Sequence, residues 1–364
     1  MSKLTLQSIV VSLCVPLLAV GQQSGAPSGS AAQPRAESAE QQTSASDATH
    51  GRIQLDVVVT DKAGKAVSGL ELKDFTLLDN NLPAKILSFH ESGGAEGKPD
   101  PSVEVIFLID TVNVDFKYVS FVRQEIEKYL TRNGGHLDHP ASLQVFTNTG
   151  IDSGSGPTTD GNTLAAEVSH LDNHLRTVRL GEGVNGEIEL YYASLKAIAE
   201  IANNESNKPK RKILIWAGPG WPMLDSVNVE IGLEAQRQNF DAIVRLSTIL
   251  REARVSVYSI SSAESGAGAS AYRGYLKGVK TAAKSNPGNL ALKVLAVQSG
   301  GRVLGPGNDI AAQIDSCIED ADAFYMLSFD PPRADHASEY HDLKVVIGKP
   351  GLMARTNAGY YNQP

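Results

Sequence analysis

The residues best placed for chemistry follow the most apolar stretch of the chain. Asp110 directly follows the run VEVIFLI at residues 103–109, and Thr111 and Asn113 come next. Carboxylate, hydroxyl and amide oxygens are the hard ligands that Mg²⁺ and Mn²⁺ prefer in proteins. Alternatively, Asp110 is a turn residue that caps the following helix. We expect the second role, because a single carboxylate holds a divalent cation weakly.

A second candidate loop follows another apolar run, ILIWA at residues 213–217. Gly218 and Gly220 flank a proline there, and Trp221 comes next. An aromatic side chain on such a loop is typical of protein interfaces, but Trp221 can equally fold over the sheet end and cover Trp216. Ligands of open α/β sheets bind at the carboxyl ends of the strands. We therefore predict partner-binding loops at Thr111, Asn113, Gly218, Gly220 and Trp221.

Other patterns resemble enzyme motifs only in their spacing. Gly181, Gly183 and Gly186 match G-x-G-x-x-G, but the apolar strand that dinucleotide binding requires does not precede them. His170 and His174 have the spacing of metal ligands on a helix, without a third ligand. The sequence also contains no G-x-S-x-G nucleophile motif. We predict no catalytic residue and no cofactor.

The remaining histidine and cysteine candidates are expected to be structural. His136 and His139 are predicted to lie in a surface loop before a strand, where polar residues are ordinary. Cys317 lies among apolar residues of a predicted helix, so we expect its thiol to be buried in the core. Neither pattern assembles a nucleophile, a base and an orienting group.

The elements that position these loops alternate between strand and helix. Apolar, β-branched runs predict strands at residues 103–109, 143–147, 213–217, 255–260 and 302–304. Apolar residues at helical spacing predict helices at residues 119–130, 164–175, 188–201, 231–250, 290–297 and 310–318. This alternation predicts an α/β fold with a doubly wound, mainly parallel sheet. Further strands are predicted outside this part, at residues 53–60, 75–78, 86–89, 323–329 and 343–347.

Composition divides the chain into five parts. We predict a signal peptide at residues 1–21, a disordered polar linker at 22–50, a small β-module at 51–100, an α/β domain at 101–322 and a C-terminal β-extension at 323–364. Of the two cysteines, Cys14 lies in the predicted signal peptide, so the mature chain cannot form an internal disulfide. We expect the β-extension to pack beside the β-module instead of extending the parallel sheet.

Several segments together resemble a known family. The run VVVTDKAGKAVSGLELKDFTLLDN begins at Val57, ILIWAGPG begins at Ile213, FYMLSFDPPR begins at Phe324 and LKVVIGKPGLMARTNAGYY begins at Leu343. With Asp110 after the first central strand, these runs resemble a von Willebrand factor type A (vWA) domain. The more similar group is bacterial, abundant in Acidobacteria, and called von Willebrand factor A related. The resemblance covers residues 52–361.

The resemblance implies a place for a metal site but not its full ligand set. Standard vWA domains bind Mg²⁺ or Mn²⁺ through Asp-x-Ser-x-Ser, a threonine and a second aspartate. Asp110 matches the first ligand, whereas Val112 and Val114 occupy the two serine positions and Gly218 follows the strand where the aspartate is expected. No threonine lies around residues 187–189. The resemblance thus implies a degenerate metal-ion-dependent adhesion site.

Charge and composition narrow the classes of partner. The net charge is -8 and the chain has no long basic run, which disfavours nucleic-acid binding. We expect no membrane span in the mature chain and an exported, periplasmic or extracellular location. The expected function is that of a non-enzymatic binding module that contacts an unknown protein or cell-envelope component. The alternative is a metal-assisted hydrolase or nucleotide-dependent enzyme that uses the loops around Asp110 and residues 181–186.

Overall fold

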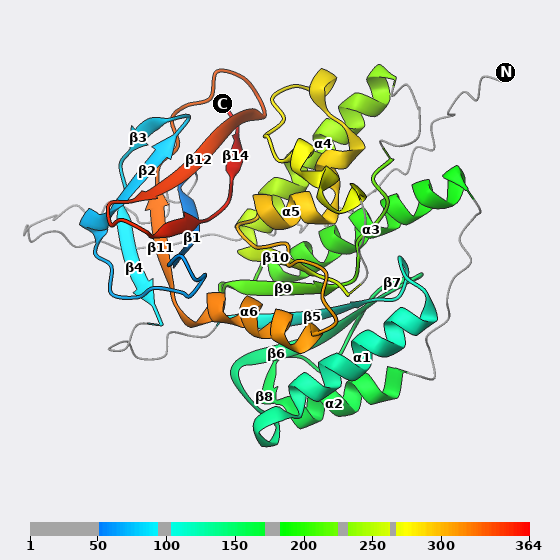
Figure 1. The fold of residues 1–364 in the computed structure, drawn as a ribbon. Coiled ribbons are helices and arrows are strands. Elements are labelled where there is room, and N and C mark those ends of the chain that lie inside the picture. The colour runs from blue at the N-terminus through cyan, green and yellow to red at the C-terminus, as the bar shows by residue number, and fades with distance from the viewer. Residues whose placement is uncertain (1–50, 94–102, 172–182, 225–231, 263–266) are drawn as a thin grey trace, which may run out of the picture. The chain divides into compact units, whose positions relative to one another are not determined.

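The computed structural model describes residues 51–93, 103–171, 183–224, 232–262 and 267–364 (Figure 1). These residues belong to one compact unit, Ala48–Pro364. The predicted signal peptide and polar linker lie outside the described residues, as do most of the segment between the β-module and the α/β domain and the second histidine of the predicted pair, His174.

The centre of the fold is a mostly parallel sheet. Its order is β10-β9-β5-β6-β7, and β8 also pairs with β6. The strands are β5 (Glu104–Asp110), β6 (His136–Thr147), β7 (Gly150–Ser153), β8 (Thr158–Asp160), β9 (Lys212–Ala217) and β10 (Val255–Ile260). β10, β9, β5 and β6 run parallel, whereas β7 and β8 are antiparallel to β6. Every residue of β5, β9 and β10 is buried, as the near-continuous apolar runs predict.

Helices cover both faces of this sheet (Figure 1). One core contains side chains of α1 (Phe116–Leu130), α2 (Gly161–His170) and α6 (Ile310–Asp322). The other contains side chains of α3 (Val184–Glu205), α4 (Leu233–Glu252) and α5 (Leu292–Gln298). Short 3₁₀ helices are η1 (Leu72–Asp74), η2 (Arg132–Gly135), η5 (Ala267–Tyr275), η6 (Ala282–Lys284) and η7 (Pro287–Leu290). The predicted α/β class with a mainly parallel sheet is confirmed.

The two ends of the described chain together form two antiparallel sheets. One has the order β13-β1-β11-β4 and the other β14-β12-β2-β3. Their strands are β1 (Ile53–Thr60), β2 (Phe75–Asp79), β3 (Leu82–Ala84), β4 (Ser88–Ser92), β11 (Phe324–Phe329), β12 (Glu339–Ile347), β13 (Met353–Arg355) and β14 (Gly359–Asn362). A common apolar core joins the sheets into a β-sandwich, to which both chain ends contribute. The C-terminal segment therefore packs beside the N-terminal strands, as predicted.

Three sequence predictions differ from the structure. Residues 136–140 were expected to form a loop but are the start of β6, where an irregular register with β8 leaves room for polar residues. Residues 302–304 form no strand, and only Val303 makes an isolated bridge to Ser259. The strand expected at residues 86–89 begins at Ser88 as β4.

Two ion pairs fasten the sandwich to the α/β part. Arg254, just before β10, contacts Asp56 of β1 with N···O distances of 3.1 and 2.6 Å. Asp320 of α6, which is fully buried, accepts a 2.7 Å hydrogen bond from Arg355 of β13. Arg254 lies directly before β10. The sandwich therefore meets the parallel sheet near the amino ends of the parallel strands. No helix among the described residues is long and apolar enough to cross a bilayer.

Candidate functional site

The Asp110 carboxylate lies at the carboxyl end of β5 and is only 1% exposed. One oxygen, Oδ1, accepts hydrogen bonds from the backbone amides of Val112 and Asn113, each at 3.0 Å. The other, Oδ2, accepts from Asn113 Nδ2 at 2.9 Å and from Trp216 Nε1 at 3.0 Å. A carboxylate has about four acceptor positions. All four are therefore occupied by N–H donors.

The N–H donors give the Asp110 carboxylate a positive electrostatic complement. Burial raises the pKa of the Asp110 carboxyl, and the hydrogen bonds from Asn113 and Trp216 offset part of that effect. Gly218 packs against the same side chain, because a Cβ atom there would lie 2.8 Å from the Asp110 Cβ. Asp110 is thus a hydrogen-bonded hub of its loop.

The N-cap of α1 is Asp115, not Asp110 as predicted. The Asp115 side chain accepts a 2.8 Å hydrogen bond from the Tyr118 amide. The expectation that Asp110 caps this helix is wrong, because five residues separate it from the first helical turn, Phe116 onwards. Asp110 instead shapes the intervening turn, as an Asx side chain commonly does.

The neighbouring loop residues tie β5 to two other elements. Thr111 Oγ1 donates to the Phe146 carbonyl of β6 at 2.7 Å. Asn113 Nδ2 donates to Ser194 Oγ of α3 at 3.1 Å, and Ser194 is fully buried. The sequence did not assign Ser194 or the Trp216 indole to this site. Ser194 lies 81 residues from Asn113, and Trp216 lies 106 residues from Asp110. The loop is thereby held by contacts from β6, β9 and α3.

The second predicted loop is packed inward. Trp221 is 5% exposed, stacks edge-on against Trp216 at 5.4 Å between centroids, and donates from Nε1 to the Leu290 carbonyl at 3.1 Å. Gly220 has a φ of +80°, and a Cβ there would lie 2.8 Å from the Leu292 Cβ. Of the two alternatives for Trp221, the structure matches the one in which the ring covers Trp216, and its burial leaves no face for a partner.

Three other apolar side chains are exposed on the helices α1, α3 and α4. Phe116 opens α1 and is 51% exposed, and Tyr192 of α3 is 59% exposed. Leu233 opens α4 and is 74% exposed. Tyr192 lies two residues before Ser194, which contacts the Asn113 loop, and the adjacent Tyr191 donates to Asn239 of α4 at 3.1 Å. We call these three exposed side chains the apolar rim.

The other sequence candidates do not join this site. Gly181 lies outside the described residues, and Gly183 is the residue before α3, with a φ of 69°. His170 Nδ1 lies 2.6 Å from the Ala166 carbonyl of its own helix. His139 pairs with Asp322 at 2.9 Å.

Cys317 is fully buried in the core, as predicted, and burial raises the pKa of its thiol. No group of three or more His, Cys, Asp or Glu side chains in the described part of the chain could hold a metal ion. Two cavities lined by described residues have volumes of about 20 and 10 Å³, room for about one water molecule each.

No protein-family model and no curated protein sequence matches this chain. Similar solved structures include proximal thread matrix protein 1 from the mussel byssus, with 12% identity over 64% of this chain and 50% of that chain and a TM-score of 0.35. Human COPII-coat protein Sec24c has 10% identity over 76% and 46% of the two chains and a TM-score of 0.34. Manganese-loaded Plasmodium vivax TRAP protein has 11% identity over 75% and 97% and a TM-score of 0.34. The chain spans about half the length of the first two, and scores this low carry no argument about function.

Proposed function

We propose that this chain is an exported binding module of the von Willebrand factor A related type, which contacts another protein or an envelope component through the carboxyl edge of its parallel sheet. The observation that carries the proposal is the apolar rim of Phe116, Tyr192 and Leu233. Aromatic side chains are enriched at protein interfaces, and tyrosine is enriched among residues that dominate binding energy.

The Asp110 loop supports recognition without a bridging cation. Its carboxylate is fully hydrogen-bonded, so the loop serves as a rigid base between Phe116 on one face of the sheet and Tyr192 on the other. A rigid scaffold lowers the entropic cost of forming an interface. The sandwich contacts the parallel sheet near the amino end of β10, where Arg254 pairs with Asp56.

Capture experiments with surface variants test this function. The full chain would be immobilised and exposed to the envelope fraction of its source organism, with Phe116→Ser and Tyr192→Ser as variants. The matched control is Leu82→Ser, because Leu82 is 71% exposed but lies in β3 of the sandwich. We expect each rim variant to lose most of the captured partner and the control to retain it. Equal capture by all forms would contradict the proposal.

The enzymatic alternative predicts a different outcome. A metal-assisted hydrolase would need a cation at or near Asp110, and ligand binding to the native state raises stability by about 2.7 kcal/mol at a hundredfold excess over Kd. We expect thermal unfolding of the full chain to be unchanged by Mg²⁺, Mn²⁺ or chelator. A cation-dependent shift that disappears in Asp110→Ala would favour the alternative.

A further inference from the structure

The parallel sheet ends in a strand that has a neighbour on one side (Figure 1). β7 (Gly150–Ser153) pairs with β6, and no other strand among the described residues pairs with it. A terminal strand of this kind presents unpaired backbone N–H and C=O groups, which are a template for a further strand. The outer side of β7 is therefore a place where another chain can extend the sheet.

The register of β7 determines which backbone groups point outward. Opposite residues of an antiparallel pair alternate between those that exchange two hydrogen bonds and those that exchange none. The Gly154 amide donates to the carbonyl of Leu143, the residue directly opposite, at 2.9 Å. By this alternation Asp152 also bonds to β6, whereas Ile151 and Ser153 direct their N–H and C=O groups away from β6. We call these four outward groups the free edge.

The free edge is held in place by its surroundings. The Ile151 side chain packs against the core on the α3 side of the sheet. At the hairpin, Thr147 Oγ1 donates to the Gly150 carbonyl at 3.1 Å, and beyond the strand the Ser155 hydroxyl donates to Glu167 of α2. Because the edge is already ordered, an added strand pays less entropy to form there.

Asp152 determines which sequence the free edge favours. Its side chain is exposed and forms no hydrogen bond or ion pair with another described residue. Since the Asp152 backbone bonds to β6, its pair on an added strand is the closer, non-hydrogen-bonded type. Opposite charges on such facing residues stabilise a strand pair, and like charges destabilise it. A lysine or arginine is therefore favoured opposite Asp152.

The same carboxylate disfavours pairing with a second copy of this chain. In the antiparallel register that engages Ile151 and Ser153 of both copies, the two Asp152 side chains lie directly opposite each other. Like charges at that position are destabilising, and charged side chains on edge strands commonly prevent such self-association. The charge of Asp152 thus favours a strand from a different molecule.

We propose that the free edge of β7 binds an extended peptide segment of a partner protein as an additional antiparallel strand, with a lysine or arginine opposite Asp152. Backbone hydrogen bonds to Ile151 and Ser153 hold the segment, as in other cases of strand addition. The pair with Asp152 selects its sequence. This surface is separate from the apolar rim and binds independently of it.

Synthetic peptides test this binding on the full chain. The probes are labelled seven-residue peptides of alternating threonine and valine, with lysine or glutamate at the centre, and binding is measured by fluorescence anisotropy. We expect the lysine peptide to bind about fivefold more tightly than the glutamate peptide. N-methylation of the two residues that flank the lysine should abolish binding, because their N–H groups face β7, whereas N-methylation of the lysine itself should not. Equal binding of the two methylated peptides would overturn the proposal.

Two variants of the edge provide matched tests. Ser153→Pro removes an outward N–H and keeps the pairing with β6, since proline is tolerated where the N–H side of an edge strand faces solvent. We expect its peptide affinity to fall by about tenfold or more with an unchanged unfolding midpoint, whereas the rim variant Phe116→Ser should bind the peptide like wild type. In Asp152→Lys, the glutamate peptide should become the tighter ligand. Wild-type affinity in Ser153→Pro, or an unchanged preference in Asp152→Lys, would contradict strand addition.

The unbound protein distinguishes the other possible occupants. We expect the amides of Ile151 and Ser153 to exchange rapidly with solvent and to become protected when the lysine peptide is added. Protection of both amides without peptide would mean that another part of this chain covers the edge. A wild-type dimer that Ser153→Pro abolishes would instead assign the edge to a second copy. Either result would overturn the proposal.

Discussion

Replacing Asp110 by asparagine tests the hydrogen-bonded hub most directly. The substitution keeps the shape of the side chain but turns one acceptor oxygen into an NH₂ group. If the remaining oxygen still accepts the hydrogen bonds from the Val112 and Asn113 backbone amides, the new NH₂ group faces two other donors, Asn113 Nδ2 and Trp216 Nε1. Each buried donor left without an acceptor costs about 1–3 kcal/mol. Since an amide is cheaper to bury than a carboxylate, we expect a net loss of about 2–4 kcal/mol.

Urea unfolding of the full chain measures this loss. The matched control is Asp115→Asn, because Asp115 is exposed and asparagine is as good an N-cap as aspartate. We expect the control to change the free energy of unfolding by less than about 0.5 kcal/mol. The reasoning is refuted if Asp110→Asn is as stable as the control. It is also refuted if Mg²⁺ stabilises wild type and not Asp110→Asn, since Asp110 would then be a ligand.

Three further predictions concern buried polar contacts. Arg355→Met removes a partner of the fully buried Asp320, and we expect a loss of about 3 kcal/mol in urea unfolding; a loss below about 1 kcal/mol would contradict this. Burial lowers the pKa of Lys212 to about 8. Between about pH 8 and the ordinary value of 10.5, the unfolded chain binds more protons at this lysine than the folded chain, so stability should rise with pH there. Lys212→Met lacks this contribution, and parallel pH profiles of the two proteins would refute the prediction. Trp221→Phe leaves the Leu290 carbonyl without its donor, so we expect a loss of about 1–3 kcal/mol with partner capture unchanged; reduced capture would return Trp221 to the interface.

Local sequence patterns determined most of the secondary structure. The continuous apolar run at residues 103–109 predicted a strand buried on both faces, and β5 is buried throughout. Period-two alternation likewise predicted β1, and helical spacing predicted α1. These signals are readable because the direction of a side chain depends on the geometry of its own element. Weak, polar strand starts such as residues 136–140 carry no such signal.

The sequence also located the candidate site without determining its chemistry. Asp110 and Asn113 were placed at the carboxyl edge because every parallel strand ends there. Whether Asp110 binds a cation or N–H donors depends on the Trp216 indole, which lies 106 residues away. The choice for Trp221 between surface and core depended similarly on Leu290, 69 residues away.

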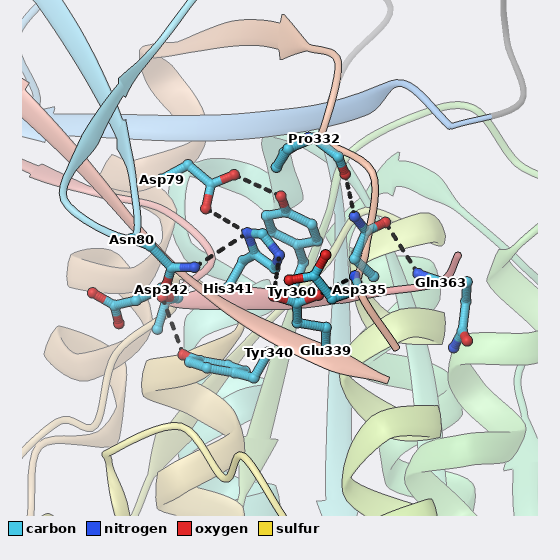
Figure 2. Close-up of polar contacts among 12 residues, drawn as sticks. Asp79, Asn80, Pro332, Asp335, Glu339, Tyr340, His341, Asp342, Tyr360 and Gln363 are labelled. Atoms are coloured by element: carbon cyan, nitrogen blue, oxygen red, sulfur yellow. Dashed lines mark hydrogen bonds and ion pairs between the residues drawn. The ribbon is translucent and has the colours of Figure 1, made fainter. Parts of the chain in front are cut away.

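Tertiary structure decided how the two β-segments at the chain ends pair. Asp79 and His341 are 262 residues apart, yet they share a 2.7 Å contact because β2 and β12 pair in one sheet (Figure 2). The sequence predicted that these segments pack together but not their register, and a one-residue slip would turn His341 to the other face. The apolar residues therefore determined which segments are buried, whereas register and packing decided which polar groups meet.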